Sequence, residues 1–177
     1  EKSRILESLK LKKNDYFLVT AHRSENVDNK ASLKNIFLGL EKISKTFRKK
    51  IIYPIHPRTM SKINKLEIPK GIKLIKPLGF FDFSKLEKNS FCLITDSGTI
   101  PEEALFFQKP CVTIRTTTER PEIIEAGSNI LSGLNPENIL QSTQTITSKK
   151  PDWQWNKALG DGKTARKVLN ILAGNLY

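Results

Sequence analysis

The sequence predicts an α/β protein whose parallel sheet is covered by helices on both faces, a Rossmann-like, doubly wound arrangement. Two observations support this prediction. Short, continuously apolar segments that suit buried strands alternate with segments whose apolar residues recur at helical spacing. Polar clusters directly follow most of the strand-like segments, which is where such sheets bind ligands. The length of 177 residues suits a single domain.

Six strands follow from the apolar segments of the chain. Each is short and almost wholly apolar, as expected for strands that are buried on both faces. They are predicted at residues 16–20, 51–54, 72–75, 91–95, 111–114 and, more briefly, 129–131. Helical segments separate them, so we expect the strands to run parallel.

Helices are expected before, between and after these strands. Asp82 is expected to cap one helix, Pro101 to lie in the first turn of another, and Gly127 to mark the C-terminal end of a third. The predicted helices span 3–10, 31–47, 59–66, 82–88, 99–107, 121–126, 136–147 and 163–173. Residues 21–30 are predicted to form a polar loop.

The composition narrows the class of protein. No apolar segment approaches the roughly 18–20 residues that span a bilayer, and no signal peptide is recognisable, so we expect a cytoplasmic protein without a membrane segment. Cys92 and Cys111 lie inside apolar strands, and there is no Cys/His cluster. This pattern favours buried free thiols over a metal site.

The net charge of +12, from 30 Lys and Arg against 18 Asp and Glu, favours an anionic partner such as a phosphate or a nucleotide. An alternative is that lysines scattered along polar helix faces, such as Lys42, Lys45 and Lys49, account for most of the charge. No stripe of arginine and aromatic residues indicates RNA binding, so we expect no nucleic-acid partner.

Polar clusters follow four of the strands, at 21–26, 56–59, 95–103 and 115–122. Since the carboxyl ends of parallel strands share one edge of the sheet, these clusters should meet there. The two histidines of the chain, His22 and His56, both fall in these clusters. Their placement favours a functional role over a structural one.

Ser97 and Gly98 open a predicted helix and form a candidate anion site. Free N–H groups and the helix dipole would face the strand ends, and Gly98 would let a phosphate approach the backbone closely. The alternative is ordinary capping of that helix by Asp96 or Ser97. The longer glycine-rich dinucleotide motif is missing, so the segment alone does not define the site.

Glu102, Glu103, Arg115 and Arg120 follow the candidate anion site in the sequence. Successive helical residues point about 100° apart, so at most one of the two glutamates should face the cleft, where a carboxylate can hold ribose hydroxyls. The two arginines can neutralise phosphate charge. For Arg120 the alternative is an ion pair with a neighbouring glutamate.

In this order, the clusters resemble the C-terminal domain of the non-hydrolysing UDP-N-acetylglucosamine 2-epimerase family. The resemblance implies one nucleotide-sugar-binding domain at 1–177, belonging to a two-domain enzyme of the GT-B-like architecture with its active site between the domains. The matching segments are VTAHRSEN (19–26), YPIHP (53–57), TDSGTIPEE (95–103), KPCVTIRTTTERPE (109–122), EAGSNILSG (125–133) and GDG (160–162).

The resemblance also implies a reaction. The family inverts C2 of a UDP-2-acetamido sugar by elimination and re-addition of UDP, for the synthesis of surface polysaccharide precursors, and needs no metal or redox cofactor. By this resemblance His22 helps UDP to leave, Ser97 and Gly98 hold phosphate at the helix start, and Arg120 binds phosphate.

Further roles are implied for the remaining residues. Glu103, in preference to Glu102, would hold the ribose. Arg23 and His56 match a contact with a second UDP-sugar that activates some bacterial members. The acidic residues that move protons at C2 belong to the family's N-terminal domain and have no counterpart here. We therefore expect a fragment that is inactive alone and a full-length protein that is a homodimer.

Three alternatives stay open. The HPRT (56–59), LGFFDF (78–83) and DSGTIPEE segments look more like a branch that acts on related UDP-2-acetamido sugars, including the enzyme that forms UDP-N-acetyl-L-fucosamine. A glycosyltransferase half would share the fold, but TDSG followed by TERPE favours an epimerase. A nucleic-acid-binding module rests on the net charge alone.

Overall fold

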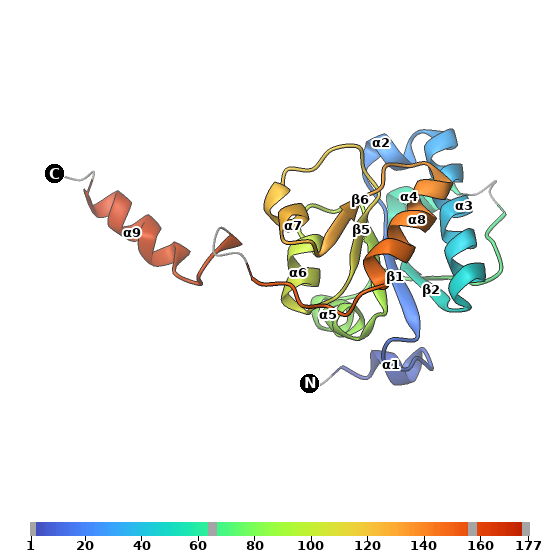
Figure 1. Cartoon of the computed structure of the whole chain (residues 1–177), viewed down its shortest axis with the longest axis horizontal. Coiled ribbons are helices and arrows are strands. Elements are labelled where there is room, and N and C mark those ends of the chain that lie inside the picture. The colour runs from blue at the N-terminus through green and yellow to red at the C-terminus, as the bar shows by residue number, and fades with distance from the viewer. Residues whose placement is uncertain (1–2, 64–66, 156–158, 175–177) are drawn as a thin grey trace.

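The computed structural model describes residues 3–63, 67–155 and 159–174, and confirms the doubly wound parallel sheet (Figure 1). Its strands are β1 (Tyr16–Thr20), β2 (Lys50–Pro54), β3 (Ile72–Ile75), β4 (Cys92–Thr95), β5 (Cys111–Thr113) and β6 (Asn129–Leu131). They pair in parallel in the order β3-β2-β1-β4-β5-β6. The chain therefore winds outward twice, from β1 in one direction and from β4 in the other. This order opens a crevice at the carboxyl ends of β1 and β4.

The helices connect the strands and extend the chain beyond them. They are α1 (Ile5–Ser8), α2 (Ser24–Val27), α3 (Lys30–Phe47), α4 (Pro57–Lys62), α5 (Phe80–Asn89), α6 (Ile100–Phe106), α7 (Pro121–Glu125), α8 (Pro136–Thr147) and α9 (Thr164–Gly174). Asparagine caps start the two longest helices that cover the sheet: Asn29 accepts two backbone N–H groups at the start of α3, and Asn135 does so at the start of α8.

Several predicted boundaries are wrong. The predicted polar loop contains the short helix α2. Asp82 does not cap α5: the helix starts earlier, after Gly79, and Asp82 instead accepts a hydrogen bond from the hydroxyl of Ser3 at 2.6 Å. The helix predicted at 59–66 begins at Pro57, and its predicted end at 64–66 lies outside the described residues.

The core has two layers because side chains on each strand alternate between the faces of the sheet. On β1, Phe17 and Val19 join the cluster that contains the apolar faces of α3 and α8. Tyr16 and Leu18 join the opposite cluster, formed with α1, α5 and α6. Every one of these four side chains is at most 1% exposed. Burial on both faces explains the continuously apolar strands.

The C-terminal part leaves this core. Trp153 packs against the α3/α8 layer, and its carbonyl accepts a hydrogen bond from Gln108. Trp155 lies further out, with its ring edge-on to that of Phe106. Figure 1 shows α9 projecting away from the sheet, and all its side chains are exposed. Within the described parts of the chain, no helix is both long and apolar enough to cross a membrane.

The buried side chains of α3 should contribute more to the stability of the fold than the exposed side chains of the same helix. Leu40 is 0% exposed and Leu38, on the same helix, is 37% exposed. We expect Leu40→Ala to lower the free energy of unfolding by about 2–5 kcal/mol, because it leaves a cavity in the core. Leu38→Ala should cost less than about 1 kcal/mol. Urea unfolding of both variants measures the difference, and equal losses would contradict the packing of α3 described here.

Glu87 on α5 should make stability depend on pH. It is 1% exposed, and its Oε1 has no hydrogen-bond partner among the described residues. Burial, and then the adjacent carboxyl of Glu103, raise the pKa of Glu87 above its ordinary value. Above the ordinary pKa the unfolded chain has released this proton while the folded chain still holds it. Stability must therefore fall as the pH rises towards the raised pKa.

We expect Glu87→Gln to remove this dependence. The free energy of unfolding of the variant minus that of the unsubstituted chain should be larger at pH 8 than at pH 5, by about 1–2 kcal/mol. Glu67→Gln, at an exposed position, is the matched control and should leave the pH profile unchanged. Urea unfolding across this pH range is the measurement. Parallel profiles for the Glu87 variant and the unsubstituted chain would show that the buried group does not titrate as described.

Candidate functional site

The buried carboxylate of Asp96 joins the ends of β1 and β4. Asp96 is 0% exposed and directly follows β4. Its oxygens accept hydrogen bonds from the backbone N–H groups of His22 and Arg23, at 3.0 and 2.9 Å, and from the side-chain amide of Asn26 at 3.1 Å. Asn26 also donates to the carbonyl of Ile114, after β5. Asp96 thereby fixes the segment that carries His22.

The other end of this segment is held at Ala21. Its carbonyl accepts hydrogen bonds from the hydroxyls of Tyr53 on β2, at 2.6 Å, and Thr59 on α4, at 2.8 Å. Burial, and then the charge of Asp96, raise the pKa of Tyr53, so its hydroxyl stays protonated and can donate. Side chains from β2 and α4 therefore hold the residue before His22.

The two histidines come together as the sequence predicts. Their ring centroids are 5.6 Å apart, and both line a cavity of about 250 Å³ at the carboxyl ends of β1, β2 and β3. His22 is about half exposed, with Nδ1 3.5 Å from Oδ1 of Asp96. His56 accepts the N–H of Arg58 at the start of α4. Leu78 and Phe83 complete the apolar side of this cavity.

The turn before α6 differs in detail from the prediction. The N–H of Ser97 is not free, because it donates to the hydroxyl of Thr95 at 2.9 Å. The hydroxyls of Ser97 and Thr99 lie 3.2 Å apart and are exposed. Around Gly98 there is open space, since a Cβ there would meet no atom within 4 Å. Neither Asp96 nor Ser97 caps α6: its N-cap is Thr99, without a side-chain cap.

The two glutamates of α6 have different partners, as their adjacent positions predict. Glu102 forms an ion pair with Arg120 at the start of α7. The local pair with a neighbouring glutamate, which was the alternative to phosphate binding for Arg120, is therefore not the ion pair that forms. Glu103 lies beside the buried carboxyl of Glu87. Arg120 remains about half exposed, so its guanidinium borders both α6 and solvent.

Arg115 and Arg23 share one carboxylate. The two terminal nitrogens of the Arg115 guanidinium donate to Glu119, at 2.7 and 2.6 Å, and this contact is the main reason that the pKa of Glu119 falls to about 2. Arg23 lies 3.3 Å from Glu25 and 3.9 Å from Glu119. Arg115 is 6% exposed and both of its terminal nitrogens donate to Glu119, so we do not retain it as a phosphate ligand.

Sequence reasoning missed the connecting residues of the site. Asp96 was expected only as a helix cap, and Asn26 and Tyr53 were not singled out. A signal was present for Asp96, because an acidic residue directly after a buried strand needs several donors. Among the described residues, no group of three or more His, Cys, Asp or Glu side chains could hold a metal ion.

The chain is similar to known proteins over nearly its whole length. A family model described as UDP-N-acetylglucosamine 2-epimerase matches residues 1–173. The UDP-N-acetylglucosamine 2-epimerases of Methanococcus maripaludis and Methanocaldococcus jannaschii are 46% and 43% identical over 93% of this chain. The crystal structure of the M. jannaschii UDP-GlcNAc 2-epimerase in complex with UDP-GlcNAc and UDP superimposes with a TM-score of 0.86, at 41% identity and over 97% of this chain.

The chain spans about half the length of these relatives: 46% of each of the two sequences and 49% of the solved chain. The structural match covers 97% of this chain. It also agrees with the GT-B-like architecture expected from the sequence. The chain belongs to the UDP-N-acetylglucosamine 2-epimerase family.

Proposed function

We propose that this chain is the UDP-binding half of an isomerase that inverts C2 of a UDP-2-acetamido sugar, most simply UDP-N-acetylglucosamine. The observation that supports the proposal best is the location of the polar cluster in the fold. The cluster of His22, Asp96, Ser97 and Gly98 lies at the carboxyl ends of β1 and β4, where doubly wound sheets bind nucleotides. The relative that matches 97% of the chain has a structure in complex with UDP-GlcNAc and UDP.

The diphosphate would lie over the turn before α6. The open space at Gly98 admits a phosphate, and the exposed hydroxyls of Ser97 and Thr99 are available as donors. Because α6 has only seven residues, we assign more weight to these groups than to its dipole. Arg120 would bind phosphate oxygens from the α7 side, and must partly exchange its pairing with Glu102 to do so.

The ribose would be held by Glu103. Glu102 is engaged by Arg120, whereas Glu103 has a carboxyl group, Glu87, as its neighbour. Since Glu87 has a raised pKa, its protonated carboxyl can donate a hydrogen bond to Glu103. The negative charge then lies on Glu103, the residue that would meet the ribose hydroxyls. Glu102 is the second choice for this role.

His22 would assist the departure of UDP. Elimination breaks the bond between C1 and the diphosphate oxygen and the C2–H bond, and forms a C1=C2 double bond; re-addition reverses these changes with the proton on the other face of C2. Because Nδ1 of His22 faces Asp96, Nε2 is directed away from it and can donate to the leaving oxygen. The groups that move the C2 proton would come from the other half of the protein.

That other half needs a surface to pack against, and the chain offers one. Phe80, Phe81 and Phe106 are 72%, 81% and 69% exposed, and Phe80 and Phe106 line one cavity with the half-exposed Trp155. On α9, apolar side chains that include Leu169 and Leu172 also lie exposed. We propose that these surfaces contact the other domain of the same polypeptide. Homodimer contacts would then belong to that domain.

The choice of sugar provides a second candidate within the same reaction. The segments that look like the UDP-N-acetyl-L-fucosamine branch contribute His56, Leu78 and Phe83, and these residues line the cavity beside His22. A related UDP-2-acetamido sugar is therefore the alternative substrate. Arg23 and His56 remain our candidates for contacts with an activating second UDP-sugar.

UDP binding to the 177-residue chain tests the site directly. We expect calorimetry to detect UDP binding, and Ser97→Asp to weaken it by about tenfold or more, because a carboxylate would face the diphosphate. Ser142→Asp on α8 adds the same charge elsewhere and should leave the affinity within about twofold. Equal affinities for all three proteins would place UDP away from α6.

Catalysis requires the full-length enzyme. We expect it to exchange the C2 hydrogen of UDP-N-acetylglucosamine with D₂O, and the 177-residue chain to show no exchange. In the full-length enzyme, His22→Asn should lower kcat by about 10²–10⁴-fold with little change in KM, as expected for loss of a general acid. Mass spectrometry of recovered sugar measures the exchange, and running the related sugars in parallel identifies the substrate. Transfer to an acceptor without exchange would point to a glycosyltransferase.

A further inference from the structure

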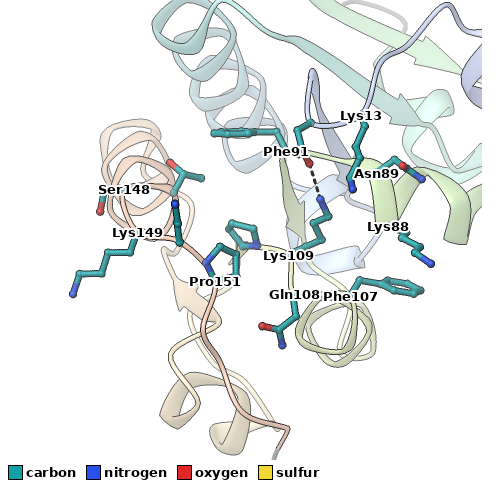
Figure 2. Close-up of a pocket in the computed structure, with 14 residues that line it drawn as sticks. Lys13, Lys88, Asn89, Phe91, Phe107, Gln108, Lys109, Ser148, Lys149 and Pro151 are labelled. Atoms are coloured by element: carbon teal, nitrogen blue, oxygen red, sulfur yellow. Dashed lines mark hydrogen bonds between the residues drawn. The ribbon is translucent and has the colours of Figure 1, made fainter.

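A second cavity lies at the opposite edge of the sheet, where the strands begin (Figure 2). It encloses about 620 Å³, within the range of about 300–1,000 Å³ that is usual for small-molecule sites. Residues that directly precede β1, β4 and β5 line it, together with residues 147–151 at and after the end of α8. The proposed UDP site is at the other end of the same strands, so the two are separate.

The lining of this cavity is strongly basic. Five lysines contribute to it, and no Asp or Glu is among the described residues that line it. None of these lysines forms an ion pair with any residue in the described ranges. The lysines are Lys13, Lys88, Lys109, Lys149 and Lys150. The nearby carboxylate of Asp15 is engaged by Lys49, which lies over the ring of Phe91 on the cavity wall.

Lys109 distinguishes this cavity from an ordinary cluster of surface lysines. The residue is 8% exposed, and its ammonium donates to the side-chain oxygen of Asn14 at 2.7 Å, a neutral partner. Burial, and then the charge of Lys13, lower the pKa of Lys109. A buried ammonium beside a second cation is unfavourable unless an anion compensates it.

Figure 2 shows how the charged groups are arranged. Lys13 and Lys109 point into the same part of the view, and the charge of Lys13 acts on Lys109, whereas Lys88 lies to one side with its ammonium directed outward and Lys149 points away. Phe107 and Pro151 add apolar walls. The charges of Lys13 and Lys109 therefore meet in a concave site with apolar sides, which suits a small molecule better than an extended polymer.

We propose that this cavity binds a small molecule that carries two or more phosphate groups. One phosphate would lie between Lys13 and Lys109, where it offsets both charges. The remaining volume and Lys88 accommodate at least one further phosphate. The site is independent of the proposed UDP site and could be occupied at the same time.

Calorimetry with inorganic tripolyphosphate tests the proposal, using the 177-residue chain with Ser97→Asp so that the proposed UDP site is blocked. We expect binding with one-to-one stoichiometry. Adding Lys13→Gln and Lys88→Gln, both at exposed positions that should not disturb folding, should weaken binding by about tenfold or more. The matched control is Lys34→Gln with Lys73→Gln, which removes the same charge elsewhere and should change the affinity by less than about twofold.

The outcomes distinguish specific binding in this cavity from nonspecific attraction of an anion to a basic surface. Absence of binding, or equal weakening by both pairs of substitutions, would overturn the proposal. Backbone amide shifts provide a second readout: Asn14, Asn89 and Lys109 should shift on titration, and shifts confined to residues 97–99 would also overturn it. A parallel titration with ATP identifies the source of the phosphates. Tighter binding of ATP than of tripolyphosphate indicates a nucleotide that uses the apolar walls, and equal binding indicates the phosphate chain alone.

Discussion

The candidate site depends on one buried carboxylate. Asp96 has no exposed surface, and a carboxylate removed from water is tolerated only where hydrogen-bond donors replace the solvent. The donors come from the backbone of His22 and Arg23 and from the amide of Asn26. The same bonds that satisfy Asp96 thus fix the direction in which the chain leaves β1. If they were lost, the orientation of His22 would be lost with them.

The topology makes this interaction possible. Because β1 and β4 are neighbours in parallel register, Thr20 lies opposite Thr95, and their hydroxyls are 2.7 Å apart. The next residues along both strands must therefore emerge side by side. One of them is Asp96, and two residues after Thr20 comes His22. Residues more than 70 positions apart meet here because the chain reverses its winding direction between these two strands.

The sequence was sufficient for those features that local patterns determine. Apolar runs located all six strands, and β1 was predicted to the residue, because its first four residues are buried and give a continuous apolar run. The location of the polar clusters followed from the same reasoning. The partners of individual polar side chains could not be predicted in this way. Arg120 pairs with Glu102, 18 positions away, and Asp82 pairs with Ser3, 79 positions away. Such pairings depend on how α5, α6 and α7 pack, which no local pattern encodes.

The basic side chains at the two edges of the sheet differ in whether they have carboxylate partners, and this difference affects ligand binding. At the carboxyl edge each arginine that we describe already has a carboxylate partner, as Arg120 has Glu102, Arg115 has Glu119 and Arg58 has Asp28. A diphosphate that binds there must compete with these carboxylates for the arginines, which reduces the net electrostatic gain on binding. The fixed orientation of the competing groups favours ligands of matching shape and charge and so provides selectivity. At the amino edge the lysines around Lys109 have no carboxylate partner among the described residues, so an anion would meet no such competition. Five of the lysines that contribute to the net charge of +12 thus gather, without a carboxylate partner among the described residues, at the end of the molecule away from the proposed chemistry.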